Sequence, residues 1–267
     1  MNKSITFIGG GNMASAIIGG ILKAGFATPG DITATASTNA TCEKLKKQFK
    51  IQCTTDNAAA AKNADIVFLA VKPYLFSSVI PEIRDAVKPD ALIVSIAAGQ
   101  TMDTIENLFD KDIKLIRVMP NTPALVGESM SALCKNVHVT SEEMTEIVSI
   151  FESFGKAEIV SESLMDTVTG ISGSSPAYVY IMIEAMADAA VADGMARNQA
   201  YKFAAQAVLG SAKMVLETEK HPGELKDAVC SPGGTTIAAV AKLEEKGFRD
   251  AIISAQRSCV ARSKEMK

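Results

Sequence analysis

Histidine is nearly absent from this 267-residue chain, which contains only His138 and His221. Neither stands near a cysteine or a carboxylate at the spacing of metal ligands. This scarcity argues against a bound metal and leaves a Ser-His-Asp triad without its parts. A reaction carried out here should need little from side-chain acids, nucleophiles or metals, so its chemistry is expected to come from a cofactor.

Cysteine is sparse as well, and the five cysteines include no C-x-x-C pair. They are Cys42, Cys53, Cys134, Cys230 and Cys259. An odd, scattered set favours free thiols in a reducing compartment. No apolar run approaches the roughly 18 residues of a membrane helix, and the N-terminus shows no signal-peptide pattern. We therefore predict a cytoplasmic protein.

An excess of one charge is also lacking: 27 Lys and Arg balance 30 Asp and Glu, for a net charge of −3. A nucleic-acid or membrane-surface binder would normally carry a basic stripe. With 48% hydrophobic residues and a mean hydropathy of +0.17, the chain is too apolar to be disordered. We expect a globular protein that binds a small molecule, and neither nucleic acid nor a membrane.

The first part of the chain alternates short apolar runs with helical segments. We predict strands at residues 4–8, 32–36, 51–53, 66–71, 92–96, 115–119, 130–133 and 157–160. Several of these runs are apolar throughout, as parallel strands covered on both faces must be. The pattern indicates an α/β domain over residues 1–160.

The strand pattern stops after Val160, and residues 161–267 predict helices separated by Gly and Pro. Residues 178–192 are apolar on nearly every face, with Glu184 and Asp188 as exceptions. Such a helix must be buried all round, and in a domain this small we expect part of that burial to come from another subunit. We predict an all-α C-terminal dimerisation domain; the alternative is an ordinary bundle within one chain.

A glycine-rich turn, G-G-G-N-M-A at residues 9–14, follows the first predicted strand and opens a helix. Gly9 suits a tight turn, Gly11 lets backbone N–H groups approach a pyrophosphate, and Ala14 permits close helix–strand packing. A glycine pattern alone is weak evidence, but this position at the first strand–helix junction predicts dinucleotide binding. The N-terminal domain is therefore predicted to be of the Rossmann type.

The second predicted strand ends in Ser37, Thr38 and Asn39, where an NAD-preferring site usually carries Asp or Glu. Hydroxyls and an amide, with Lys44 nearby, suit a 2′-phosphate better than a carboxylate would. This favours NADP over NAD. The alternative is that Ser37 and Thr38 only cap the next helix, which is compatible with both cofactors.

Two further loops follow predicted strands, at the edge where open α/β sheets bind ligands. The first is A-V-K-P at residues 70–73, whose Lys72 either meets the cofactor or is simply exposed to solvent. The second, at residues 119–123, holds Asn121 between two prolines. Its amide is suited to a carboxamide or to the backbone.

Two segments of the helical half combine hydroxyls, small residues and a helix start, at residues 172–176 and 231–236. Unpaired N–H groups at a helix start attract anions, so we expect a substrate carboxylate at the second segment. The alternative is that both are only capped helix starts.

A dinucleotide site with a small anionic substrate, and no strong acid or nucleophile, fits hydride transfer to a C=N bond. A protonated imine carries its own positive charge, whereas a ketone would need an added electrophile to stabilise the alkoxide.

The chain resembles the pyrroline-5-carboxylate reductases nearly from end to end. The resemblance rests on FIGGGNM at 7–13, AVKP at 70–73, MPNTP at 119–123, SGSSPAY at 172–178 and, most specifically, LKDAVCSPGGTT at 225–236. It implies NAD(P)H-dependent reduction of L-1-pyrroline-5-carboxylate to L-proline, the last step of proline biosynthesis. It also implies an intertwined homodimer in which the partner completes the active site, and dimers that often assemble into larger rings.

The resemblance further implies the binding residues. Those for the pyrophosphate are Gly9, Gly11, Asn12, Met13 and Ala14, and those for the adenosine end are Ser37, Thr38 and Asn57. Those for the nicotinamide side are Ala70, Val71, Lys72, Pro73, Ala97 and Asn121. Those for the substrate carboxylate are Ser231, Gly234, Thr235 and Thr236, with the catalytic Thr236 hydroxyl on the ring nitrogen. Ser175 departs from the Gly that relatives often have.

Two other functions compete with this interpretation. A two-domain dehydrogenase of a β-hydroxy acid would usually carry a catalytic lysine in its first long helix, but residues 176–193 contain none. A nucleotide-binding regulatory protein would need the glycine turn but no second receptor, and residues 231–236 argue against it.

Overall fold

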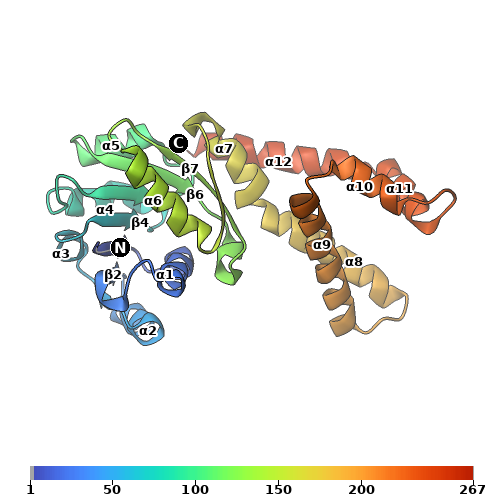
Figure 1. Ribbon diagram of the computed structural model, residues 1–267, viewed down its shortest axis with the longest axis horizontal. Coiled ribbons are helices and arrows are strands. Elements are labelled where there is room, and N and C mark those ends of the chain that lie inside the picture. The colour runs from blue at the N-terminus through green and yellow to red at the C-terminus, as the bar shows by residue number, and fades with distance from the viewer. Residues whose placement is uncertain (1–2, 267) are drawn as a thin grey trace. The chain divides into compact units, whose positions relative to one another are not determined.

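The computed structural model describes residues 3–266 (Figure 1). The chain divides into two compact units. The sheet unit runs to Ser174 and also includes the residues from Cys259 onward, and the helical unit is Ser175–Ser258.

Within residues 3–266, the sheet unit is built on eight strands in the order β3-β2-β1-β4-β5-β6-β7-β8. They are β1 (Ile5–Ile8), β2 (Ile32–Thr35), β3 (Gln52–Thr54), β4 (Ile66–Leu69), β5 (Leu92–Ser95), β6 (Lys114–Met119), β7 (Ser129–Lys135) and β8 (Gly155–Ile159). Every neighbouring pair is parallel except β6 with β7. The predicted α/β, Rossmann-type class is confirmed, and each predicted strand run contains or overlaps an observed strand.

Helices and short helical turns connect the strands. The α-helices are α1 (Asn12–Ala24), α2 (Asn39–Phe49), α3 (Asn57–Ala61), α4 (Phe76–Ile83), α5 (Met102–Phe109), α6 (Ser141–Glu152) and α7 (Met165–Val168). The shorter turns are η1 (Pro29–Asp31), η2 (Pro73–Leu75), η3 (Thr122–Val126), η4 (Glu162–Leu164) and the π-helical η5 (Thr169–Gly173).

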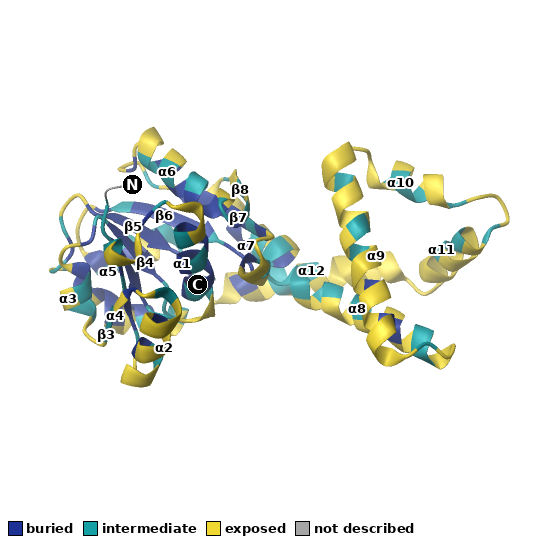
Figure 2. Ribbon diagram, turned by 60° about the horizontal axis from the view of Figure 1, so that its bottom comes forward, coloured by how far each residue is buried: buried dark blue, intermediate teal, exposed yellow. Residues whose placement is uncertain are grey.

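The core lies on both faces of the sheet, as the continuously apolar strands require. Residues of α1 and α6 pack on one face and residues of α4 and α5 on the other. Neighbouring strand residues such as Val67 and Phe68 point to opposite faces. Phe68 is fully buried and stacks on Phe7 with ring centroids 4.5 Å apart. Figure 2 shows these strands in dark blue.

The chain first passes from the sheet unit to the helical unit after Ser174, which is later than the domain boundary predicted near residue 160. The reason is packing: Met165 is 1% exposed and clusters with Ala132 and Cys134 of β7. The C-terminal residues also belong to this unit, because the Ser263 hydroxyl donates to the buried Asp166 carboxylate at 2.8 Å. The sheet unit therefore includes η4, α7 and η5, and also the C-terminal residues from Cys259 onward.

The helical unit consists of α8 (Ser175–Ala192), α9 (Arg197–Thr218), α10 (Pro222–Val229), α11 (Thr235–Glu245) and the first part of α12 (Phe248–Glu265). Gly194, at φ +98°, ends the α8 segment, and α8 and α9 approach closely through Ala187, Ala200 and Ala204. Small side chains permit such an approach. The segment is helical as predicted.

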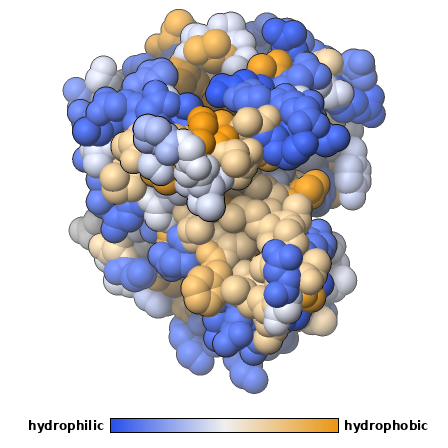
Figure 3. All heavy atoms as spheres, turned by 90° about the vertical axis from the view of Figure 1, so that its right-hand side faces the viewer, coloured by the Kyte–Doolittle hydropathy of each residue, from blue (hydrophilic) through white to orange (hydrophobic). Residues whose placement is uncertain are grey.

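Most apolar residues of α8 are not covered within one chain. Ala187 is its buried residue, whereas Tyr180 and Ile181 are 60% and 67% exposed. The helices of this unit are accordingly drawn largely in yellow in Figure 2. Viewed from the right-hand side of Figure 1, hydrophobic surface gathers between hydrophilic patches (Figure 3). Exposed apolar surface of this extent marks an interaction face.

Candidate functional site

A cavity of about 750 Å³ opens in the sheet unit at the carboxyl ends of the strands. The strand order reverses between β1 and β4, and this switch point is where open α/β sheets bind ligands. The cavity is lined by Gly9, Gly10, Gly11, Asn12, Met13, Ala16, Ala36, Ser37, Thr41, Ala70, Val71, Lys72, Pro73, Leu75, Ile96, Ala97, Ala98, Thr122 and Leu125. Loops that follow β1, β2, β4, β5 and β6 thus meet at one place.

In the glycine turn after β1, Gly9 and Gly10 pack tightly against neighbouring residues, whereas Gly11 faces open space. Gly9 has φ +104°, and a Cβ there would lie 2.9 Å from the carbonyl of Ala70. Its N–H donates to the Thr35 hydroxyl at 3.0 Å. At Gly10 a Cβ would lie 2.4 Å from Leu45, so neither position accommodates a side chain without movement.

Gly11 differs, because a Cβ built on it meets nothing within 4 Å. It caps α1 and has no side chain to pair with the first N–H groups of that helix. Those N–H groups, together with the positive end of the helix dipole, form an anion site. A bare backbone facing an open cavity fits the pyrophosphate of a dinucleotide. Ala14 lies beneath, 1% exposed in the core.

The three residues predicted for the adenosine end differ in their surroundings. Ser37 lines the cavity, together with Thr41 one helical turn further on. Thr38 caps α2 by accepting from the Thr41 N–H at 3.3 Å, so the helix-capping alternative holds for Thr38. Asn57 opens α3 outside the cavity lining, and its amide donates to Glu82 at 2.8 Å.

The nicotinamide side is formed by the loops after β4, β5 and β6. The predicted residues Ala70, Val71, Lys72, Pro73 and Ala97 all line the cavity. Asn121 does not, because it is 8% exposed and its amide is bonded at both ends within the chain.

Sequence reasoning did not select several lining residues. These are Gly10, Ala16, Ala36, Thr41, Leu75, Ile96, Ala98, Thr122 and Leu125. Ala36, Ile96 and Ala98 lie at or just beyond predicted strand ends, so a rule that takes the residues at each strand end would have found them. Thr41 and Leu125 carry no such signal, because they reach the cavity from within a helix or turn.

Two cysteines of the sheet unit, Cys53 and Cys134, are poorly suited to nucleophilic chemistry. Burial raises the pKa of Cys53 to about 12, with a further contribution from its hydrogen bond to Cys42. Burial also raises the pKa of Cys134 to about 11. Both thiols stay protonated at neutral pH, and the thiolate is the reactive form.

The predicted carboxylate residues share one turn of the helical unit, between α10 and α11. The Gly234 N–H donates to the Ser231 carbonyl at 3.0 Å, and Gly234 then caps α11. A Cβ at Gly234 would lie 2.4 Å from the Ser231 hydroxyl, which explains the glycine. Thr235 and Thr236 begin a helix of 11 residues whose cap offers no side chain. The expected helix start is therefore present, and its role as an anion site stays a prediction.

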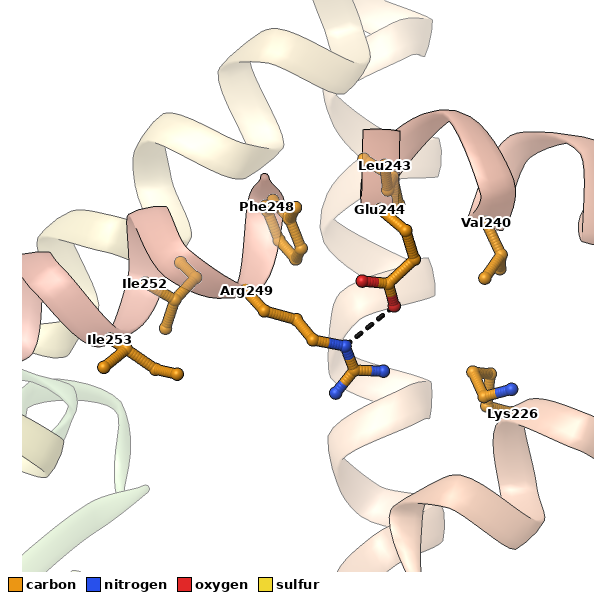
Figure 4. Close-up of a pocket in the computed structure, with 8 residues that line it drawn as sticks. All are labelled: Lys226, Val240, Leu243, Glu244, Phe248, Arg249, Ile252 and Ile253. Atoms are coloured by element: carbon orange, nitrogen blue, oxygen red, sulfur yellow. Dashed lines mark hydrogen bonds and ion pairs between the residues drawn. The ribbon is translucent and has the colours of Figure 1, made fainter. Parts of the chain in front are cut away.

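The helical unit also contains an apolar groove of about 500 Å³ (Figure 4). It is lined by Lys226, Val240, Leu243, Glu244, Phe248, Arg249, Ile252 and Ile253. Arg249 pairs with Glu244 at 2.7 Å, and the other lining side chains are largely aliphatic or aromatic. This groove is suited to apolar side chains rather than to a charged small molecule.

Among residues 3–266, no three His, Cys, Asp or Glu side chains gather closely enough to hold a metal ion. No helix in the same range combines the length and apolar character needed to cross a membrane.

Family comparisons match both parts of the chain. Residues 162–266 match the family described as pyrroline-5-carboxylate reductase dimerisation, and residues 4–99 match the family described as NADP oxidoreductase, coenzyme F420-dependent. A pyrroline-5-carboxylate reductase of Escherichia coli (strain K12) is 52% identical, with 100% of this chain and 99% of that protein covered.

Solved structures agree over the full length. The pyrroline-5-carboxylate reductase of Coxiella burnetii has a TM-score of 0.92 at 36% identity, covering 100% of this chain and 99% of that one. The Plasmodium falciparum pyrroline carboxylate reductase, solved with NADP bound, has a TM-score of 0.90 at 32% identity, covering 99% and 98%. Because a pyrroline-5-carboxylate reductase is 52% identical over the whole chain, the chain belongs to the pyrroline-5-carboxylate reductase family.

Proposed function

We propose that this protein reduces L-1-pyrroline-5-carboxylate to L-proline with NADPH, the last step of proline biosynthesis. The observation that carries the proposal is the open glycine turn at the switch point of the sheet, in a chain 52% identical to a pyrroline-5-carboxylate reductase over its whole length. The scarcity of histidine and the high thiol pKa values agree with hydride chemistry that needs no side-chain nucleophile.

The chain's own residues bind and orient in this proposal. The first N–H groups of α1, beside Gly11, Asn12 and Met13, hold the pyrophosphate. The loops at Ala70, Val71, Lys72, Pro73 and Ala97 form the nicotinamide side of the cavity. When bound, the reduced nicotinamide supplies a hydride, which forms the new C–H bond at the imine carbon while the C=N π electrons pass to nitrogen.

The turn at Ser231, Gly234, Thr235 and Thr236 holds the substrate carboxylate in this proposal. The unpaired N–H groups of α11 favour an anion, and the bound carboxylate fixes one end of the ring. The Thr236 hydroxyl hydrogen-bonds the ring nitrogen. Because the protonated imine already carries its charge, orientation is the main contribution required from the protein.

NADPH is proposed as the preferred cofactor, with NADH also possible as a substrate. The hydroxyls of Ser37 and Thr41 line the cavity at the end of β2, with no Asp or Glu there to repel a 2′-phosphate. The Plasmodium falciparum relative was solved with NADP bound, which supports the choice. Steady-state kinetics with both cofactors test it, and a higher kcat/KM with NADH would overturn the preference.

The helical unit is proposed to form a homodimer, and the dimers to assemble into a larger ring. Its family match is a dimerisation domain, and its apolar residues and groove are exposed within one chain. Light scattering on the purified protein measures the mass. A monomer at micromolar concentration would contradict the dimer, and a species no larger than a dimer would contradict the ring.

A cytoplasmic location is proposed on the five free cysteines, which suit a reducing compartment.

The decisive assay follows the loss of reduced-nicotinamide absorbance with pyrroline-5-carboxylate and NADPH. The expected result is turnover with this pair and none with a β-hydroxy acid plus NADP⁺. Cofactor binding without turnover of any substrate would instead indicate a regulatory protein.

A further inference from the structure

Asn121 is held at the junction between β6 and η3 by two hydrogen bonds that use opposite ends of its amide. Its Nδ2 donates to the Ser172 carbonyl at 3.1 Å, and its Oδ1 accepts from the Met130 N–H at 3.0 Å. A carbonyl can only accept and an N–H can only donate, so the two partners fix which way the amide points. The side chain is 8% exposed.

These two bonds connect segments far apart in the chain. Met130 belongs to β7. Ser172 belongs to the turn η5, after which the chain leaves the sheet unit at Ser174. The same turn lies against the end of β6, because a Cβ on Gly173 would come within 2.5 Å of the Met119 methyl group. Asn121 therefore fastens β7 and η5 to the end of β6.

The turn that Asn121 fastens has an irregular geometry. The Ser174 N–H reaches back five residues to the Thr169 carbonyl at 2.9 Å, which makes η5 a π-helical turn. Such turns are rare and often mark functional sites. Cys259 adds a contact from the thiol to the Ser174 hydroxyl at 3.2 Å. The Ser172 carbonyl, within the same turn, accepts its hydrogen bond from Asn121.

On its other side, Asn121 begins the wall of the cofactor cavity. It is the cap of η3, and its carbonyl accepts from the Ala124 N–H at 3.2 Å. Thr122 and Leu125 of η3 line the cavity, although Asn121 itself does not. A shift of Asn121 would therefore move two lining residues on the predicted nicotinamide side.

We propose that Asn121 is a positioning residue: its amide sets the η3 wall of the cavity and the η5 turn, and it does not bind the nicotinamide directly. This inference rests on the proposed reductase function. It replaces the expectation that the Asn121 side chain lines the nicotinamide side.

The test uses Asn121→Asp in the full-length protein. A protonated carboxyl can donate to the Ser172 carbonyl and accept from the Met130 N–H, as the amide does, but an ionised carboxylate cannot donate. Burial raises the pKa of such a carboxyl. The ratio of variant to wild-type kcat is therefore expected to rise about 10-fold from pH 8 to pH 5.5, because protonation of the carboxyl restores one hydrogen bond.

Asn136→Asp is the matched control. Asn136 also donates to a backbone carbonyl, of Ile113 at 2.8 Å, and accepts from a backbone N–H, of Leu115 at 3.2 Å. Unlike Asn121, it donates in addition to the Glu106 carboxylate at 2.7 Å. It lies at the other end of β6 and does not line the cavity. We expect a lowered Tm but a kcat ratio that stays flat with pH.

Binding measurements separate positioning from direct contact. The Kd of NADPH is expected to stay within about 3-fold of wild type, as is that of adenosine 2′,5′-bisphosphate, which lacks the nicotinamide. The inference would be overturned if the Kd of NADPH rose 10-fold or more while that of adenosine 2′,5′-bisphosphate did not, or if the kcat ratio were as flat with pH as that of the control.

If Asn121→Asp does not fold, Asn121→Ser replaces it, and a kcat of this variant within 2-fold of wild type would overturn the inference. Inactive wild-type protein would instead refute the reductase proposal.

Discussion

Gly11→Leu separates binding from folding more sharply than any other change in the glycine turn. Gly11 has φ −78° and ψ −171°, an extended conformation open to any residue. A Cβ there meets nothing within 4 Å, so the side chain grows into the cavity rather than into the core. We expect a change in the free energy of unfolding below about 1 kcal/mol.

The same side chain would occupy the space of the pyrophosphate at the start of α1. If two N–H bonds to the charged pyrophosphate are lost, at about 1.5–3 kcal/mol each, the cost is about 3–6 kcal/mol. The Kd of NADPH would then rise by about 10²–10⁴-fold.

The assay is a fluorescence titration with NADPH, accompanied by a thermal melt. Gly30→Leu is the control, because Gly30 is exposed in η1 and does not line the cavity. Its NADPH affinity is expected to equal that of wild type. A Kd for Gly11→Leu within 3-fold of wild type would refute the cradle, whereas a collapsed Tm would refute the claim that the position is open.

Three further changes probe other parts of the molecule. Thr236→Ala is expected to lower kcat/KM by about 10–100-fold through loss of one hydrogen bond to a polar reacting group, while Thr236→Ser keeps most activity; equal kinetics in both would remove the hydroxyl from the mechanism. Phe68→Ala is expected to cost about 3–5 kcal/mol in urea unfolding, because Phe68 is fully buried against Phe7, and a cost below 1 kcal/mol would contradict that packing. Hydrogen bonds from Lys88, at 2.7 Å, and from Ser4 hold the pKa of Asp65 below its ordinary value, so its stabilisation is present above about pH 4 and lost as pH falls through the lowered pKa. Asp65→Asn should therefore lower Tm at pH 7 by the equivalent of at most about 1 kcal/mol, given the exposure of the pair, and the difference should shrink below pH 4; a constant difference would argue against the ion pair.

The sequence by itself determined the strands, the glycine turn, the helices between the strands and the all-helical C-terminal segment. These features depend on local causes: apolar runs such as residues 66–69 must be covered on both faces, and a glycine turn between a strand and a helix leaves N–H groups free. The cavity accordingly contains Gly9, Gly11 and Lys72 as predicted. Their binding roles stay predictions.

Only the tertiary structure decided which partners the polar side chains take. Asn121 could have met a carboxamide or the backbone, and the bond to Ser172, 51 residues away, depends on how η5 packs against β6. The late crossing at Ser174 has the same origin, because Met165 is buried against β7. Contacts between distant segments follow from packing, and no local spacing in the chain encodes them.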